Sequence, residues 1–150
     1  MVEEREATYM IEYGSGYIYI NNQGYILEIA TEKIEKPILQ GIETSLEELQ
    51  PGSRLCTEDL NKMSTVIKIM NFAESNEIAN LITRIDIEND ANYKILLESE
   101  EKVVYLGDST YLDRKIQWVK KIIEETKNIS GEILLNIDLN KNNPVFRQSV

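Results

Sequence analysis

The chain has 150 residues, a formal net charge of −10 and a sequence pI near 4.6. Its length predicts one domain that can bury a core without disulfides or metals. The acidic charge opposes binding to nucleic acid and to anionic lipid headgroups, because both are polyanions. The chain has no histidine and a single cysteine, Cys56, so it lacks the commonest general base and cannot form an internal disulfide.

The first part of the chain predicts three consecutive β-strands. Residues 7–13 are apolar enough for a strand, and the Gly-Ser-Gly segment at 14–16 ends it. Residues 17–20 and 25–29 are then two alternating runs of β-branched and aromatic residues, joined by a polar turn that ends in Gly24. Because Gly24 can adopt the positive φ of a tight reversal, this pattern is typical of a β-hairpin with one buried face.

An irregular connection and a long helix are expected next. Residues 30–52 hold two of the three prolines and show no sustained hydrophobic period, with a short helical turn expected at 45–49. Thr57 is the expected N-cap of a helix that ends near Ser75 or Asn76. The apolar residues that recur at helical spacing are Leu60, Met63, Ile67 and Met70.

The second half of the chain predicts further strands and a second helix. The expected strands are 81–87, 93–98, 102–106, 133–139 and 145–147. A capping sequence at 108–110 predicts that the helix lies between the third and the fourth of these strands. The apolar stripe of this helix, which we expect to face the sheet, is formed by Leu112, Ile116, Val119 and Ile123.

This order of elements predicts an α+β fold. We expect a mostly antiparallel sheet of about eight strands with two long helices packed on one face, because the chain has three strands, a helix, three strands, a helix and two strands in succession. No linker or internal repeat divides the sequence, so residues 1–150 are expected to form a single β domain.

The patterns that could indicate catalysis or metal binding fail on their spacing. Residues 86–90 resemble the start of a calcium loop, but Ala91 and Leu97 stand where that loop needs glycine and glutamate. The glycines at 14–16 lie between two expected strands and have no helix behind them to bind phosphate. Cys56 lies near a helix start, but no histidine is present to act as its base. The sequence therefore predicts no enzyme, no cofactor and no metal.

The last expected strand is the strongest candidate for a functional site. Residues 145–147 follow Pro144 and are followed by only three more residues, which is typical of a strand at a sheet edge. Such an edge has unpaired N–H and C=O groups, which either remain free or pair with an extended segment of a partner. On the residues alone, an inert edge and a docking edge both stay open.

Several segments along the chain occur in an order that points to one family. They are residues 4–7 (Glu-Arg-Glu-Ala), 17–29, 37–41, 105–107 followed by Leu112, Lys115 and Ile116, and 137–139 (Ile-Asp-Leu). Together they resemble the extracytoplasmic β domain of the FtsQ/DivIB family of bacterial cell-division proteins, over nearly the whole chain. Two positions depart from the family pattern. Glu6 stands where proline is frequent, and Asn140 and Lys141 stand where some relatives have an arginine and an aromatic residue.

The resemblance implies a noncatalytic scaffold of the divisome that acts in septum formation. Such a scaffold binds the extracytoplasmic parts of FtsB/DivIC-like and FtsL-like proteins, and its C-terminal strand accepts a strand from the partner. The residues of this chain implied in partner binding are Asp138, Leu139, Asn140, Lys141, Val145, Phe146 and Arg147.

The resemblance also implies a location. Parent proteins of the family carry a cytoplasmic tail, one membrane helix and a small POTRA domain before this β domain, and none of these is visible in the sequence. The chain is therefore expected to be the C-terminal part of a single-pass membrane protein. It would lie on the extracytoplasmic face of the membrane at the division septum, and contact the membrane only through the parent's helix.

Two other classes of function stay open. A domain that binds peptidoglycan or another small ligand would have a concave, aromatic-lined pocket in place of a free edge. An enzyme that acts on cell-wall material would need two carboxylates that converge in a groove, and the sequence spacing does not provide such a pair.

Overall fold

The computed structural model describes residues 6–149, in which nine strands form one sheet. Residues 4 and 5 of the first matched segment lie outside this range. In chain order the main elements are β1 (Tyr9–Tyr13), β2 (Gly16–Ile20), β3 (Ile26–Ala30), β4 (Ile38–Gln40), α1 (Thr57–Ser75), β5 (Arg84–Asp86), β6 (Tyr93–Leu97), β7 (Lys102–Gly107), α2 (Leu112–Glu125), β8 (Gly131–Leu134) and β9 (Val145–Gln148). Short 3-10 turns occur at Leu46–Glu48, Ala79–Leu81 and Glu98–Glu100.

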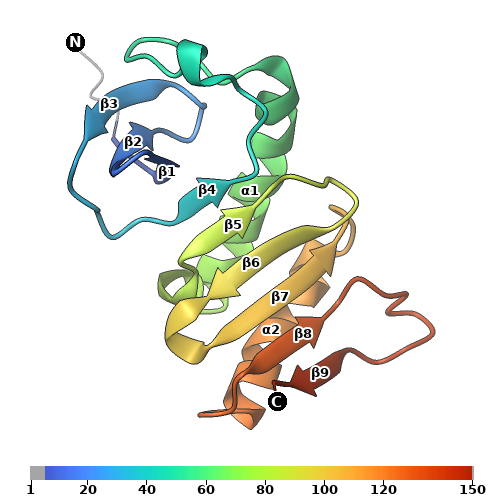
Figure 1. Ribbon diagram of the computed structural model, residues 1–150. Helices are drawn as coiled ribbons and strands as arrows, with labels where there is room; N and C mark the ends of the chain where they lie inside the picture. Colours follow the sequence, from blue (N-terminus) through green and yellow to red (C-terminus); the bar gives the residue numbers. More distant parts are fainter. Residues whose placement is uncertain (1–5, 150) are drawn as a thin grey trace.

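The strands lie side by side in the order β3-β2-β1-β4-β5-β6-β7-β8-β9 (Figure 1). Within the described residues, β1–β2, β2–β3, β5–β6, β6–β7 and β8–β9 are antiparallel, whereas β1–β4, β4–β5 and β7–β8 are parallel. The two edge strands, β3 and β9, lie at opposite ends of the molecule (Figure 1).

The expected fold class is therefore wrong. A mostly antiparallel sheet of about eight strands with two long helices packed on one face is not what forms, because the sheet is mixed and has nine strands in the described part of the chain. Helix α1 connects β4 to β5, and α2 connects β7 to β8. A helical connection returns the chain to the end of the sheet where the first strand began, so the next strand runs in the same direction. The succession of a strand, a helix and a strand is the sequence signal for these two crossovers.

Several element boundaries also differ from expectation. Strand β4 lies inside residues 30–52, where an irregular connection is expected, although the predicted helical turn within that segment is present. Helix α1 has Cys56 rather than Thr57 as its N-cap residue, and it ends at Ser75 as predicted. The strand expected at 81–87 is shorter, because a 3-10 turn occupies Ala79–Leu81.

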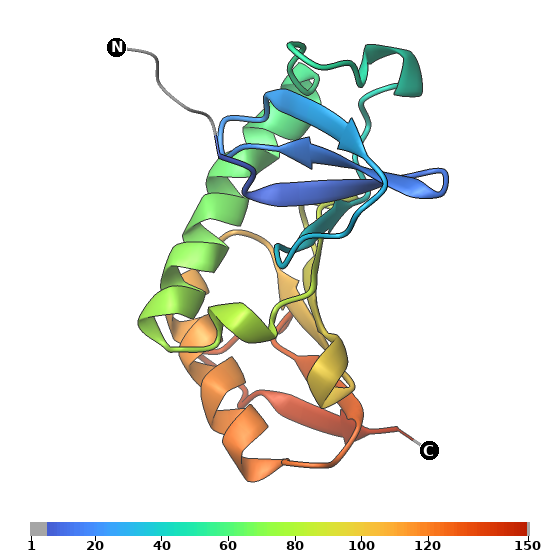
Figure 2. The same ribbon diagram turned by 90° about the vertical axis from the view of Figure 1, so that its left-hand side faces the viewer.

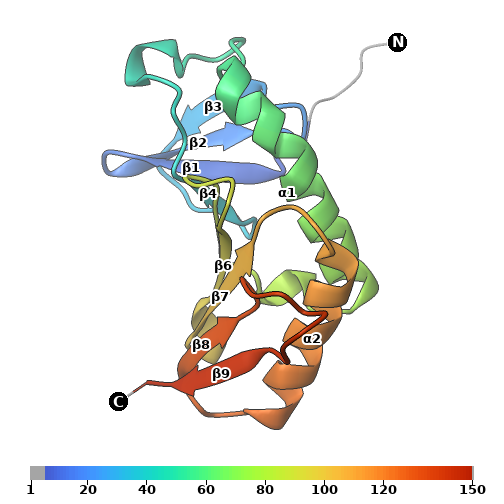
Figure 3. The same cartoon turned by 90° about the vertical axis from the view of Figure 1, so that its right-hand side faces the viewer.

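Helices α1 and α2 lie next to each other along the sheet (Figures 2 and 3). The apolar stripe predicted for α2 is buried, which confirms that prediction. In α1 the buried apolar residues are Met63, Val66, Ile69 and Ala73, whereas Leu60, Ile67 and Met70 are only half-buried. The helical period is thus confirmed for α1, but the centre of its buried face is shifted by about one residue from the predicted stripe.

A buried carboxylate fixes the loop that precedes α1. Asp59 is fully buried and accepts hydrogen bonds from the N–H of Glu43 at 2.9 Å, the N–H of Thr44 at 2.9 Å and the Thr44 hydroxyl at 2.5 Å. The Thr44 hydroxyl in turn accepts a hydrogen bond from the Cys56 N–H at 2.9 Å. Thr44 therefore takes the capping role at the start of α1, because the side chain of the N-cap residue Cys56 makes no capping hydrogen bond.

Tyr9 in β1 gives a prediction about alkaline pH. It is 1% exposed, and burial raises the pKa of its phenol to about 12. In the unfolded chain the phenol has its usual pKa of about 10, so above that pH the unfolded state loses the proton first and the free energy of unfolding falls. The full loss by pH 12 is at most about 2.7 kcal/mol. Urea denaturation between pH 10 and 12 should show a weaker pH dependence for Tyr9→Phe than for the wild type. Equal slopes would contradict this.

Candidate partner-binding edge

Strand β9 is the outermost strand of the sheet, which confirms the predicted edge position, and it pairs on one side with β8. The Ser149 N–H donates a hydrogen bond to the Ser130 carbonyl at 2.9 Å. Ladder hydrogen bonds alternate along an antiparallel pair, so Arg147 also directs its N–H and C=O toward β8. Phe146 and Gln148 therefore direct their N–H and C=O groups to the open side. These are the backbone groups that β9 leaves open for pairing with a further strand.

The turn between β8 and β9 holds four of the residues implied in partner binding: Asp138, Leu139, Asn140 and Lys141. The strand expected to continue through Leu139 ends at Leu134, so that expectation is wrong. The Asp138 carboxylate accepts a hydrogen bond from the Asn140 N–H at 3.0 Å, and the Asp138 carbonyl accepts one from the Lys141 N–H at 3.1 Å. Such local hydrogen bonds stabilise a turn in competition with the strand ladder.

Phe146 fixes β9 against the rest of the fold. Its side chain is half-buried and packs against the core, with the ring centroid 5.9 Å from Nζ of Lys102. Lys102 is 2% exposed and donates a hydrogen bond to the Thr126 carbonyl at 3.0 Å. Below the ring lies Gly131 of β8, where an added Cβ would stand 2.7 Å from a ring atom. Phe146 thus faces inward with its side chain, and its backbone groups face the open side of β9.

Val145 and Arg147 border the edge on the opposite face of the sheet. Val145 is 48% exposed, and Arg147 donates a hydrogen bond to the Glu132 carboxylate at 3.0 Å. A hydrogen bond from the Tyr105 hydroxyl and the nearby Arg147 guanidinium lower the pKa of the Glu132 carboxyl. Side chains of an added strand would lie beside Val145 and Arg147, because alternate side chains share a face.

Behind the β8–β9 turn lies a hollow of about 340 Å³ at the carboxyl ends of the parallel strands β7 and β8. Asp138 and Leu139 line it together with Lys115 and Asp108. The buried Lys115 Nζ donates a hydrogen bond to the Asp108 carbonyl at 3.0 Å and lies 3.6 Å from the Asp108 carboxylate. Desolvation lowers the pKa of Lys115, and the Asp108 carboxylate partly opposes this. Lys115 therefore ties the first turn of α2 to the segment that follows β7.

The structure gathers the implied residues into two neighbouring groups, the turn and the edge strand. Gln148, Gly131 and Lys102 complete the site and are missed by sequence reasoning. The direction of the Gln148 amide depends on the strand register, and the need for glycine at 131 depends on the Phe146 ring that covers it. The amide direction of Gln148 and the need for glycine at 131 therefore have no signal in the sequence.

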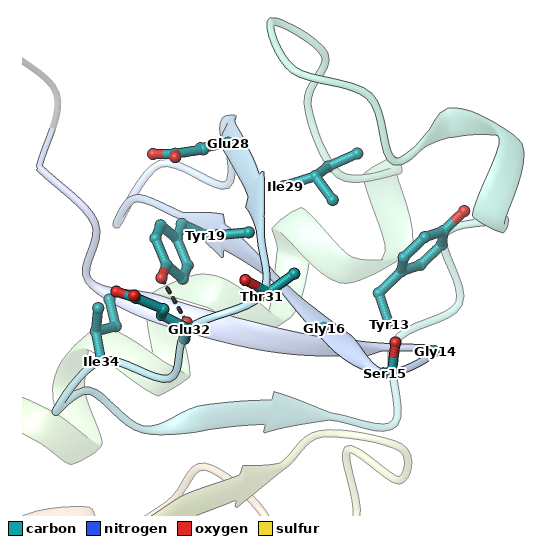
Figure 4. Close-up of a pocket in the computed structure, with 11 residues that line it drawn as sticks. Tyr13, Gly14, Ser15, Gly16, Tyr19, Glu28, Ile29, Thr31, Glu32 and Ile34 are labelled. Atoms are coloured by element: carbon teal, nitrogen blue, oxygen red, sulfur yellow. Dashed lines mark hydrogen bonds between the residues drawn. The ribbon is translucent and has the colours of Figure 1, made fainter.

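A second hollow, of about 890 Å³, runs along the opposite edge of the sheet at β3. Figure 4 shows Tyr19, Glu28 and Glu32 on one side of β3 and Tyr13 and Ile29 on the other. The Tyr19 hydroxyl donates a hydrogen bond to the Glu32 carbonyl at 2.5 Å. The two tyrosines that line this hollow therefore do not face each other across it.

The remaining candidate chemistry is limited. Among residues 6–149, no three His, Cys, Asp or Glu side chains lie close enough together to hold a metal ion. Desolvation raises the pKa of the Cys56 thiol, which disfavours the thiolate that a nucleophile needs. No helix in this part of the chain has the length and apolar character to cross a membrane.

Comparison with known proteins assigns no family. No protein-family model matches the chain, and no curated protein matches it in sequence.

Proposed function

We propose that the chain is a noncatalytic scaffold of the bacterial divisome, similar to the β domain of the FtsQ/DivIB family. It binds FtsB/DivIC-like and FtsL-like proteins by accepting an extended partner segment along β9. The observation that carries this proposal is the open side of β9, to which Phe146 and Gln148 direct their backbone N–H and C=O groups. The partners' identity and the location at the septum, on the extracytoplasmic face of the membrane, rest on the resemblance of the matched segments.

Backbone pairing alone does not give a tight complex. Two residues with outward groups can form about four hydrogen bonds, each of which contributes about 0.5–1.5 kcal/mol net. Association itself costs about 4–15 kcal/mol in lost motion. Side-chain contacts must therefore add to the ladder. The exposed Val145, the Arg147 guanidinium and the Lys141 ammonium are positioned beside the open edge or in the adjoining turn to make them.

Gln148→Pro tests the edge directly. Proline removes one outward N–H and fills the space beside the edge, yet the β8–β9 ladder stays intact because the Gln148 N–H faces away from β8. In calorimetry with the extracytoplasmic part of the FtsB/DivIC-like protein of the same organism, we expect the affinity to fall by about tenfold or more. In urea denaturation we expect the free energy of unfolding to change by less than about 1 kcal/mol.

Gln148→Ala is the matched control, because it removes the side chain and keeps the amide N–H. We expect it to bind the partner as the wild type does. Unchanged affinity for Gln148→Pro would reject docking at this edge. A wild-type chain that binds neither of the two proposed partners would reject the divisome assignment itself.

The ligand-binding alternative has less support. The hollow at β3 is lined by Tyr13 and Tyr19 and falls within the usual size of ligand sites. However, these tyrosines lie on opposite sides of β3 and the Tyr19 hydroxyl already has a partner, so they do not converge on one small molecule (Figure 4). The arrangement favours an elongated occupant that follows the strand.

A further inference from the structure

The register of the first strands determines which groups β3 exposes. The Met10 N–H donates a hydrogen bond to the Pro37 carbonyl at 3.0 Å, on the side of β4, so the next residue, Ile11, faces β2. Ile11 lies opposite Ile18, and Ile18 lies opposite Ile29. Ile18 forms its backbone hydrogen bonds with β1. Ile29, which lies opposite Ile18, therefore forms no backbone hydrogen bond with β2. The Ile29 N–H and C=O therefore face the open side of β3.

The chain itself covers the start of this edge. The Ile26 N–H donates a hydrogen bond to the Ser53 carbonyl at 2.8 Å, and the Gly52 N–H donates one to the Ile26 carbonyl at 2.9 Å. This loop pairs with β3 at Ile26 and leaves the strand before Ile29. The outer side of β3 thus already accepts a second stretch of backbone at one end, and the rest of the edge is open.

The two sides of the open edge differ in chemistry. One side carries Glu28, Glu32 and the ring of Tyr19, and the other carries Ile29 and Tyr13, which are 43% and 36% exposed (Figure 4). Of the described residues that line the hollow, none is lysine or arginine. Partial burial, and then the charges of Glu28 and Glu32, raise the pKa of the Tyr19 phenol. A negative, half-apolar side therefore lies beside a mainly apolar one.

We propose that the β3 edge is a second docking site, which takes an extended segment whose side chains alternate between a basic and an apolar residue. In a strand, successive side chains point to opposite sides. A segment paired with Ile29 would direct its lysines or arginines to Glu28 and Glu32 and its apolar residues to Ile29 and Tyr13. This site is separate from β9, at the other end of the sheet, so one scaffold could hold two chains at once. The inference does not depend on the function proposed for β9.

The probe for this site is an eight-residue peptide of alternating lysine and valine, with blocked ends. We expect it to bind the wild-type chain in calorimetry at low salt, about tenfold or more tightly than a peptide of alternating glutamate and valine. Its binding should slow amide hydrogen exchange at Ile29. Equal binding of both peptides, or slowed exchange only elsewhere in the chain, would overturn the proposal.

Charge variants separate a local site from general attraction to an acidic protein. The double variant Glu28→Gln, Glu32→Gln should weaken binding of the lysine–valine peptide by about tenfold. The matched control is Glu124→Gln, Glu125→Gln, which makes the same change in charge at exposed positions near the end of α2 and should leave binding unchanged. An equal loss in both double variants would overturn the proposal.

Backbone pairing is tested by Ile29→Pro, which removes the outward N–H without removing a hydrogen bond to β2. We expect this variant to lose binding, with circular dichroism confirming that it folds. If Ile29→Pro does not fold, slowed amide hydrogen exchange at Ile29 of the wild type tests backbone pairing in its place. Gln148→Pro should bind the peptide normally, which distinguishes this site from β9. Binding of a soluble peptidoglycan fragment at Ile29 in place of the peptide would overturn the proposal.

Discussion

Asp59→Ala is expected to lower the free energy of unfolding by about 3 kcal/mol or more. The carboxylate is fully buried and accepts hydrogen bonds from the Glu43 N–H, the Thr44 N–H and the Thr44 hydroxyl. Alanine would leave these donors without their acceptor, and each of the two buried donors on Thr44 costs about 1–3 kcal/mol when it is left unpaired. The loss also loosens Thr44, whose hydroxyl accepts the hydrogen bond from Cys56 at the start of α1.

Glu58→Ala is the control for this prediction. Glu58 precedes Asp59 in the first turn of α1, but it is exposed. Its replacement removes an interaction with the helix dipole of about 0.3–1 kcal/mol and a contact with the Cys56 thiol. Urea denaturation of both variants gives the comparison. Similar losses for the two would show that the dipole, and not the hydrogen bonds of Asp59, accounts for the effect. Partner binding at β9 should remain in the folded fraction of either variant, because the loop at Thr44 does not contact that edge.

The start of α1 shows where sequence reasoning reaches its limit. A cap is sought next to the helix, and Thr57 is the nearest candidate. The residue that takes this role is Thr44, whose hydroxyl bonds the Cys56 N–H twelve residues along the chain. Local sequence rules describe contacts within one turn, so a cap supplied by a distant loop has no local signature. The position of α1 is nevertheless predicted well, because the hydrophobic period extends over the whole helix.

The same distinction explains the error in the fold class. The alternation in β2 and the helical stripe of α2 are properties of single elements, and the sequence predicts them. Whether β4 and β5, or β7 and β8, run parallel depends on where α1 and α2 return the chain. Recognising that a strand, a helix and a strand in succession favour a parallel pair could have corrected this expectation.

The candidate edge is likewise predicted only in part. Pro144 and the short final strand indicate an edge, and β9 is the outermost strand on that side. The resemblance implies Phe146 as a partner contact, and the structure adds that its ring packs inward over Gly131. Which amides of β9 are open follows from the register with β8, which a single sequence does not specify.

Gly131→Ala is expected to detach β9 and, as a consequence, to abolish partner binding at this edge. The Gly131 backbone is not in the left-handed region, so glycine is needed there for space and not for its conformation. An added Cβ would stand 2.5 Å from the Arg147 carbonyl oxygen and 2.7 Å from the Phe146 ring. The ring could rotate away, but the carbonyl belongs to the ladder and cannot move without breaking it. Overpacking of this kind costs about 1–3 kcal/mol.

Hydrogen exchange at residues 145–149 measures the detachment, and calorimetry measures partner binding. We expect fast exchange at the Arg147 and Ser149 amides of Gly131→Ala and unchanged protection in β6 and β7, because those strands pair without β9. Glu132→Ala is the matched control on β8. It removes the ion pair with the exposed Arg147 and should leave the ladder in place. If Gly131→Ala loses protection in β9 but binds the partner as the wild type does, the partner docks elsewhere. Loss of binding in Gly131→Ala and Gln148→Pro together would identify the ordered, open backbone of β9 as the feature that the partner needs.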